Sequence, residues 1–205
     1  MKLSYVIGAC TEDRELFNLL TFLSEVRNPE HEVVVVLDSN HVTQNVKNVT
    51  KKFDWVKTVE QPFEGDFATY KNNFSKFCDG EYIFNIDADE IPQEFLVHMV
   101  NKIINDDNPP DLIVVPRINI CPGYTQSFLK KHSFSCNQMG WINWPDYQGR
   151  VYRRELMWGG KVHERIQGAT RPTLINADPT YSLWHVKSTT KQDRQDELYD
   201  QIIKA

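Results

Sequence analysis

The sequence contains no run of about 18 or more apolar residues, which excludes a transmembrane helix. Its cysteines are scattered and form no C-x-x-C pair, so neither a disulfide framework nor a zinc site is expected. The apolar segment near the start is short and has no small-residue cleavage site after it, so we expect no signal peptide. These absences predict a cytoplasmic protein with reduced thiols. The cysteines are Cys10, Cys78, Cys121 and Cys136.

What the chain does contain is enough apolar material for a folded core. Of its 205 residues, 40% are hydrophobic and 12% aromatic, which is typical of a globular protein. The net charge of −5 is unevenly distributed, because residues 1–116 have a balance of −10 and residues 117–171 have one of +6. We expect one domain over residues 1–205, whose first half handles metal and nucleotide and whose second half, 117–205, contacts an anionic partner. A solvated basic surface is the alternative explanation for the second half.

Strands and helices are predicted to alternate through the first half. Apolar residues recur there either as short continuous runs or at helical spacing. This order predicts an α/β, Rossmann-like fold with a mostly parallel central sheet and helices on both faces. Strands are expected at residues 3–9, 32–37, 55–60, 81–86 and 112–116, and helices at 14–26, 41–52, 66–78 and 93–104.

The pattern weakens after residue 116. Residues 119–150 are rich in Gly, Pro, Asn and aromatic residues and show little periodicity. Short strands are expected at 148–153, 161–165 and 179–186, and a polar helix at 193–203. The second half is therefore predicted to be an irregular extension that packs on the first half and binds the acceptor.

Two carboxylates follow the apolar strand predicted at residues 81–86. Asp87 and Asp89 are separated by one small residue, and side chains at i and i+2 of an extended chain point the same way. Paired oxygen ligands at the end of a strand suit a divalent cation that keeps positions open for phosphate oxygens. Thr11, Glu12 and Asp38 follow two other predicted strands, at the edge of the sheet where such folds bind ligands.

Four segments occur in a recognisable order. They are residues 6–12 (VIGACTE), 34–39 (VVVLDS), 65–72 (GDFATYKN) and 81–90 (EYIFNIDADE). Together they resemble the GT-A fold glycosyltransferases of family 2. Residues 148–154 (QGRVYRR) and 162–164 (VHE) are similar to a bacterial branch that modifies lipopolysaccharide cores. Two features depart from the family pattern: ACTE replaces the usual Pro-Tyr/Phe-Asn-Glu, and a common Glu-Asp catalytic pair is absent.

The resemblance implies a metal-dependent, inverting transfer of a sugar from a nucleotide sugar, most often UDP-linked, to an acceptor hydroxyl. Asp89 would be a direct ligand of Mn²⁺ or Mg²⁺, Asp87 would contact the ribose or bind the metal through water, and His185 would be a third ligand. Glu164 would act as the base, with His163 positioning or replacing it. The other donor-binding residues expected are Thr11, Glu12, Asp38, Lys71, Arg150 and Lys187.

Structural roles remain open for several of these residues. Asp38 could simply form a turn, and Asp66 could cap the helix that follows it. Lys71 and Lys187 could be solvated lysines. His185 could be a half-buried strand residue, and Glu164 could pair with a neighbouring arginine.

The acceptor is left open by the sequence. A phosphorylated lipopolysaccharide core or another anionic glycan fits the basic segment, and a hydroxymethylated base in viral DNA, modified in the host cytoplasm, fits it too. A protein side chain is a third acceptor. Peripheral membrane contact is compatible with the sequence. The sequence does not indicate an oligomeric state. Two other functions are a nucleotidyltransferase, which the absence of a Gly-rich basic loop after the first strand disfavours, and a non-catalytic carbohydrate- or nucleotide-binding module.

Overall fold

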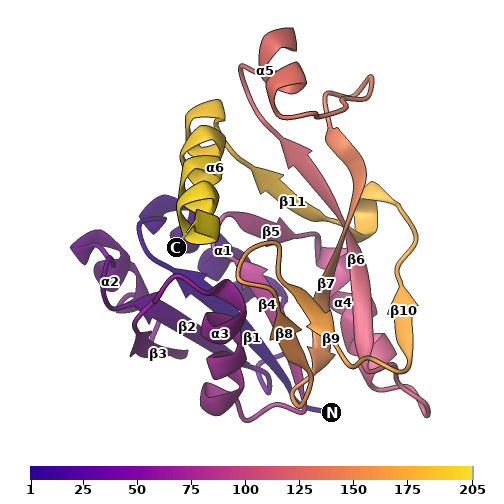
Figure 1. The fold of residues 1–205 in the computed structure, drawn as a ribbon. Coiled ribbons are helices and arrows are strands. Elements are labelled where there is room, and N and C mark those ends of the chain that lie inside the picture. Colours follow the sequence, from indigo (N-terminus) through magenta and orange to yellow (C-terminus); the bar gives the residue numbers. More distant parts are fainter. Residues whose placement is uncertain (205) are drawn as a thin grey trace.

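A computed structural model describes residues 1–204 and shows a mixed α/β fold around one large sheet (Figure 1). Four strands of the first half are parallel and adjacent in the order β3-β2-β1-β4. Their bounds are β1 Leu3–Ala9, β2 Glu32–Asp38, β3 Val56–Gln61 and β4 Tyr82–Asp87. The carboxyl ends of all four strands therefore lie at one edge of the sheet, as the sequence predicted.

Strands of the second half continue the same sheet. β7 (Ile142–Arg153) lies between β4 and β6 (Leu112–Ile120) and is antiparallel to both. β11 (Leu183–Val186) is parallel to β6, and the short β5 (Glu90–Pro92) is antiparallel to β11. β6 and β11 consequently end at the same edge as β1 and β4. The mostly parallel sheet is confirmed, with β5 and β7 as its antiparallel members.

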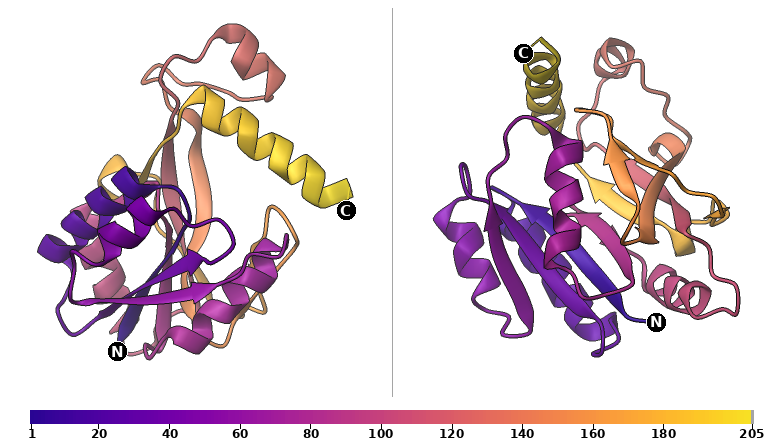
Figure 2. Two further views of the ribbon diagram at one scale, coloured as in Figure 1. Left: turned by 90° about the vertical axis from the view of Figure 1, so that its left-hand side faces the viewer. Right: turned by 60° about the horizontal axis from the view of Figure 1, so that its bottom comes forward.

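Helices cover both faces of the sheet, which confirms the predicted arrangement (Figure 2). Alternate residues of β1 point to opposite faces: Leu3, Tyr5 and Ile7 pack with helices on one side, while Val6 packs on the other. The first side holds α1 (Asp13–Val26), α2 (Gln44–Thr50) and α4 (Glu94–Ile104), and the second holds α3 (Phe67–Asn72).

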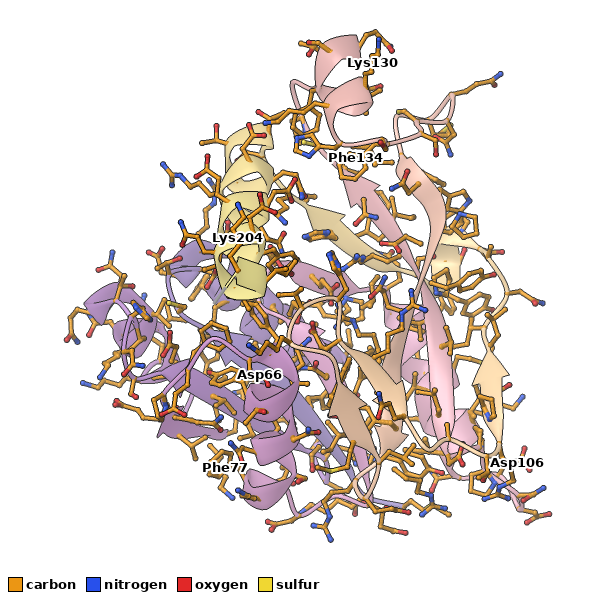
Figure 3. The ribbon with its side chains drawn as sticks, viewed as in Figure 1. Asp66, Phe77, Asp106, Lys130, Phe134 and Lys204 are labelled. Atoms are coloured by element: carbon orange, nitrogen blue, oxygen red, sulfur yellow. The ribbon has the colours of Figure 1, made fainter. Side chains whose placement is uncertain are left out.

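The single helix predicted over residues 66–78 is two elements. α3 ends at Asn72, and a 3₁₀ helix, η1, covers Asn73–Phe77 (Figure 3). The Asp66 carboxylate accepts a hydrogen bond from the Thr69 backbone N–H at 2.9 Å, so Asp66 does cap this helix. The cap fixes the start of α3 and with it the place of Lys71 one turn further on.

The second half is more regular than its sequence suggests. β6 and β7 extend beyond the neighbouring strands to a projecting lobe that contains α5 (Gln126–Lys131), where Figure 3 labels Lys130 and Phe134. The strand predicted at 161–165 is wrong, because residues 160–164 form a loop between β8 (Met157–Gly159) and β9 (Arg165–Gln167). The strand predicted at 179–186 begins as a 3₁₀ turn, η2 (Pro179–Tyr181). β10 (Pro172–Leu174) pairs with β6.

The last helix, α6 (Thr189–Lys204), crosses the edge of the sheet where β1 and β4 end (Figure 2). His132 of the lobe contacts Asp193 and Asp196 of this helix, which ties the two elements together. No helix within residues 1–204 combines the length and the hydropathy that crossing a bilayer requires.

Candidate active site

The Asp87 and Asp89 carboxylates lie at the carboxyl edge of the sheet but belong to two different clusters. β4 ends at Asp87, and Ala88 and Asp89 form a turn before β5 begins at Glu90. Strand alternation therefore does not set the direction of the Asp89 side chain. Asp87 contacts Lys71 and Arg150, whereas Asp89 contacts His185 and Lys191. The expectation that both carboxylates face one point along an extended strand is wrong.

Lys71 is the centre of the first cluster. Its Nζ lies 2.7 Å from Glu164 Oε1 and 3.6 Å from Asp87 Oδ1, so it links the first carboxylate of the sequence motif to the loop after β8. The ammonium also lies 4.6 Å from the centroid of the Trp158 ring. Asn72 holds this arrangement, because its side chain donates to the backbone oxygen of Trp158 and accepts from its N–H. Lys71 is buried, so the surface alternative for it is wrong.

Glu90, which follows the predicted metal-binding pair, is fully buried and is held by two arginines. Glu90 Oε1 lies 2.5 Å from Arg150 Nη2 and 2.8 Å from Arg117 Nη1. Arg150 Nη2 is also 2.6 Å from Asp87 Oδ2. Burial raises the pKa of Asp87, but Arg150 and Lys71 outweigh this effect and the pKa falls well below its usual range. Arg150 thus fixes Asp87 and Glu90 from within the protein.

Replacing Arg150 with Met should lower the free energy of unfolding by about 3 kcal/mol, because Glu90 would keep a buried charge with one partner removed. This is the lower end of the usual range for such a loss, since Arg117 still contacts Glu90. Urea unfolding followed by circular dichroism measures the change. The exposed Arg165 provides the control, and Arg165→Met should change stability little. Equal unfolding midpoints for the two variants would show that Glu90 does not depend on Arg150.

The second cluster surrounds Asp89, whose side chain is 14% exposed. Asp89 Oδ2 lies 3.4 Å from His185 Nε2 and 2.9 Å from Lys191 Nζ, and Lys191 is also 3.6 Å from Glu12 Oε1. Burial raises the pKa of Asp89, but the hydrogen bond from His185 and the charge of Lys191 outweigh it and hold the pKa far below its usual range. The Asp89 carboxylate is thus kept ionised and attracts positively charged groups.

The residues around Asp89 fit a divalent cation in part. A carboxylate and an imidazole face each other there, both are ligands that Mn²⁺ accepts, and the Lys191 ammonium already lies beside the carboxylate. Within residues 1–204, however, no three His, Cys, Asp or Glu side chains converge as a metal site. Asp87 is directed to Lys71 and Arg150 instead of completing such a set. Any further ligands would have to come from water or from a bound diphosphate.

The other predicted donor-binding residues are engaged mainly with the protein itself. Asp38 accepts hydrogen bonds from the backbone N–H groups of Asn40 and Phe63 and contacts His41, so it does organise a turn. Glu12 accepts from the backbone N–H groups of Cys10 and Thr11. These contacts shape the loops after β1 and β2, and direct binding of a donor by Thr11, Glu12 and Asp38 stays a prediction.

Lys187 is buried and contacts Gln195 of α6. Burial lowers the pKa of its ammonium. The solvated alternative for Lys187 is therefore wrong, and diphosphate binding by this residue stays a prediction.

Glu164 and His163 lie on the loop between β8 and β9. His163 has a φ of +54°, and Gly160 has one of +101°, a value that glycine adopts without strain. The exposed His163 ring lies 5.2 Å from that of Tyr199 on α6. Glu164 instead turns inward to Lys71, and its side chain is 12% exposed. The expected ion pair of Glu164 with a neighbouring arginine is replaced by the pair with Lys71.

The carboxylate clusters lie at the carboxyl edge of a mostly parallel sheet, which is the edge where α/β folds bind their ligands. Residues 4–170 match the family described as Glycosyl transferase family 2. The chain therefore belongs to glycosyl transferase family 2. A comparison with curated proteins finds none that matches.

Crystal structures of S. aureus TarS have a similar fold. TarS 1–349 has a TM-score of 0.63 at 17% identity, over 91% of this chain and 60% of the TarS chain. Its complex with UDP-GlcNAc has a TM-score of 0.62 at 18% identity, over 91% and 59%. The complex with UDP gives 0.63 at 16% identity, over 99% and 65%. The chain thus spans less than two thirds of the length of these structures.

Proposed function

We propose that this chain transfers a sugar from a UDP-sugar to an acceptor hydroxyl, with inversion at the anomeric carbon and with the help of Mn²⁺ or Mg²⁺. Family membership supports a glycosyltransferase. Two of the similar TarS structures are complexes with UDP-GlcNAc and UDP, which supports a uridine nucleotide as carrier. The observation that carries the proposal is the pair of Asp89 and His185 at the carboxyl edge of the sheet.

Each residue of the two clusters would have a separate role in sugar transfer. Asp89 and His185 would hold the cation, which when bound would neutralise charge on the departing diphosphate as a Lewis acid. Asp87 would contact the ribose from its fixed place beside Lys71 and Arg150. Glu164 would take the proton of the acceptor hydroxyl as it attacks. Because Lys71 contacts both Glu164 and Asp87, it would hold the proposed base at a fixed distance from the proposed ribose-binding carboxylate.

We propose an anionic glycan, such as a lipopolysaccharide core, as the acceptor. The similarity of residues 148–154 and 162–164 to the lipopolysaccharide-core branch supports this choice, as does the positive balance of residues 117–171. We also propose that residues 1–205 work as one domain in the cytoplasm. The pairing of β7 with both β4 and β6 supports one domain, because it joins the two halves in one sheet.

Two measurements test the donor and the metal. Calorimetric titration with UDP should show clearly tighter binding with Mn²⁺ than with EDTA, because a cation held by Asp89 and His185 would offset the negative charge of the diphosphate. Incubation with a panel of radiolabelled UDP-sugars without acceptor should then reveal slow hydrolysis of one of them. UDP binding that is the same with and without metal would rule out the metal-dependent mechanism, and no hydrolysis of any donor would favour a non-catalytic binding module.

A further inference from the structure

Asn119 on β6 lies between the candidate metal ligand His185 and the half-buried carboxylate of Asp146 on β7. Its Oδ1 is 2.8 Å from His185 Nδ1, and its Nδ2 is 2.8 Å from Asp146 Oδ2. The strand register produces this row, because His185 is the direct partner of Asn119 on β11. Strands β7, β6 and β11 therefore join the Asp146 carboxylate, the Asn119 amide and the His185 imidazole by two consecutive hydrogen bonds.

Asp146 accepts four hydrogen bonds from side chains of β6 and β7, which hold it in place as an anchor. Its Oδ2 accepts from Arg117 Nε at 2.9 Å and Nη2 at 2.6 Å as well as from Asn119, and its Oδ1 accepts from Gln148 at 2.8 Å. Arg117 in turn contacts the buried Glu90, so the anchor is joined to the cluster around Asp87. Four donors from strands β6 and β7 therefore fix the position of this carboxylate.

The anchor determines how the Asn119 amide is oriented. An ionised carboxylate only accepts hydrogen bonds, so the amide group that faces Asp146 must be the NH₂. The amide oxygen then faces His185, and an oxygen acceptor requires a proton on Nδ1 of the imidazole. Nε2, which is 3.4 Å from Asp89 Oδ2, is thereby the nitrogen that would bind a cation in place of its hydrogen bond to Asp89. Hydrogen-bonding capacity alone therefore determines the orientation of the Asn119 amide.

We infer that Asn119, anchored by Asp146, is a positioning residue that fixes the tautomer and the direction of His185 so that Nε2 and Asp89 bind one divalent cation. The inference rests on the proposed function, because it assigns a role within the proposed metal site. Outer hydrogen bonds of this kind raise the basicity of a ligating histidine, and their loss commonly lowers metal affinity by about 10–100-fold. Neither Asn119 nor Asp146 needs to touch the cation or the donor.

The test compares two variants that each remove one asparagine–histidine hydrogen bond. Asn119→Leu removes the contact with His185. Asn101→Leu is the matched control, because Asn101 Oδ1 lies 2.6 Å from His31 Nε2 in a similar half-buried pair at the opposite edge of the sheet. Electron paramagnetic resonance of free Mn²⁺, measured with excess UDP, gives the affinity of each protein. Asn119→Leu should bind Mn²⁺ about 10–100-fold more weakly than wild type, and Asn101→Leu should match wild type.

A second readout needs no variant and no activity. With ¹⁵N-labelled histidine, long-range ¹H–¹⁵N correlation spectra of the wild-type protein should show His185 protonated on Nδ1 both without metal and with Mg²⁺ and UDP. Protonation on Nε2 alone would overturn the inference even if Asn119→Leu failed to fold. Equal Mn²⁺ affinity in Asn119→Leu and wild type would also overturn it and leave the proposed function intact. A wild-type protein that binds no Mn²⁺ in the presence of UDP would defeat the proposed function itself, and the inference with it.

Discussion

Replacement of Asp89 with alanine is expected to lower the rate of sugar transfer by about 10³-fold. Removal of the carboxylate leaves His185 as the sole protein ligand of the proposed cation, so charge that builds on the diphosphate is poorly neutralised. A Lewis acid contributes several kcal/mol to such a transition state, and about 1.4 kcal/mol corresponds to a tenfold change in rate. Steady-state transfer from the radiolabelled donor identified by the hydrolysis screen measures the loss.

The same substitution should lower stability much less than it lowers the rate, although it removes the favourable contacts of Asp89 with His185 and Lys191. Asp89 lies in a turn, and its partner Lys191 is 35% exposed and can move into solvent when the carboxylate is gone. Asp79→Ala serves as the control, because Asp79 is an exposed acid at the other end of β4 and should affect neither property. If Asp89→Ala unfolds at a much lower temperature than Asp79→Ala, the role of Asp89 is structural. If its transfer rate stays at the wild-type level, the proposed metal site is wrong.

Glu164→Gln is expected to reduce kcat by about 10²–10⁴-fold, the usual contribution of a positioned base. Glutamine has nearly the shape of glutamate and can still accept a hydrogen bond from Lys71, but it cannot take a proton from the acceptor. The donor should therefore bind as in wild type, and KM for the donor should change much less than kcat. Measuring both constants at saturating acceptor separates the two effects.

The control for this variant is Glu155→Gln, which changes an exposed glutamate just before β8. It should transfer sugar at the wild-type rate. Full activity in Glu164→Gln would exclude Glu164 as the base and leave its contact with Lys71 as a structural ion pair. A rise in KM with unchanged kcat would mean that Glu164 helps to bind the donor and plays no part in proton transfer.

The first half of the fold could be predicted because each strand and helix there is specified locally. The four consecutive valines of β2 and the helical spacing of apolar residues in α1 place those elements within one or two residues of their observed bounds. The second half could not be predicted as well. β7 is a twelve-residue strand with two antiparallel neighbours. The residues at its amino end have no periodic apolar pattern and are held in the strand by pairing with β6.

The candidate site was predicted only where a residue type points to a chemistry. Asp87, Lys71 and Glu164 are brought together by the structure, as are Asp89 and His185. Four further residues were missed because their roles depend on register between distant strands or on a helix that crosses the sheet edge. They are Arg117, Asn119, Asp146 and Lys191. The VHE segment predicts a role for Glu164, but its pairing with Lys71 is visible only in the folded structure.

The place of β7 in the sheet has a consequence for the protein during translation. β6 is synthesised before β7, yet β7 lies between β6 and β4. A nascent chain that has emerged only to residue 120 thus exposes β6 without its neighbour, and exposed strand edges invite pairing with other chains. We expect the ribosome-bound intermediate to need shielding until residue 153 has left the exit tunnel.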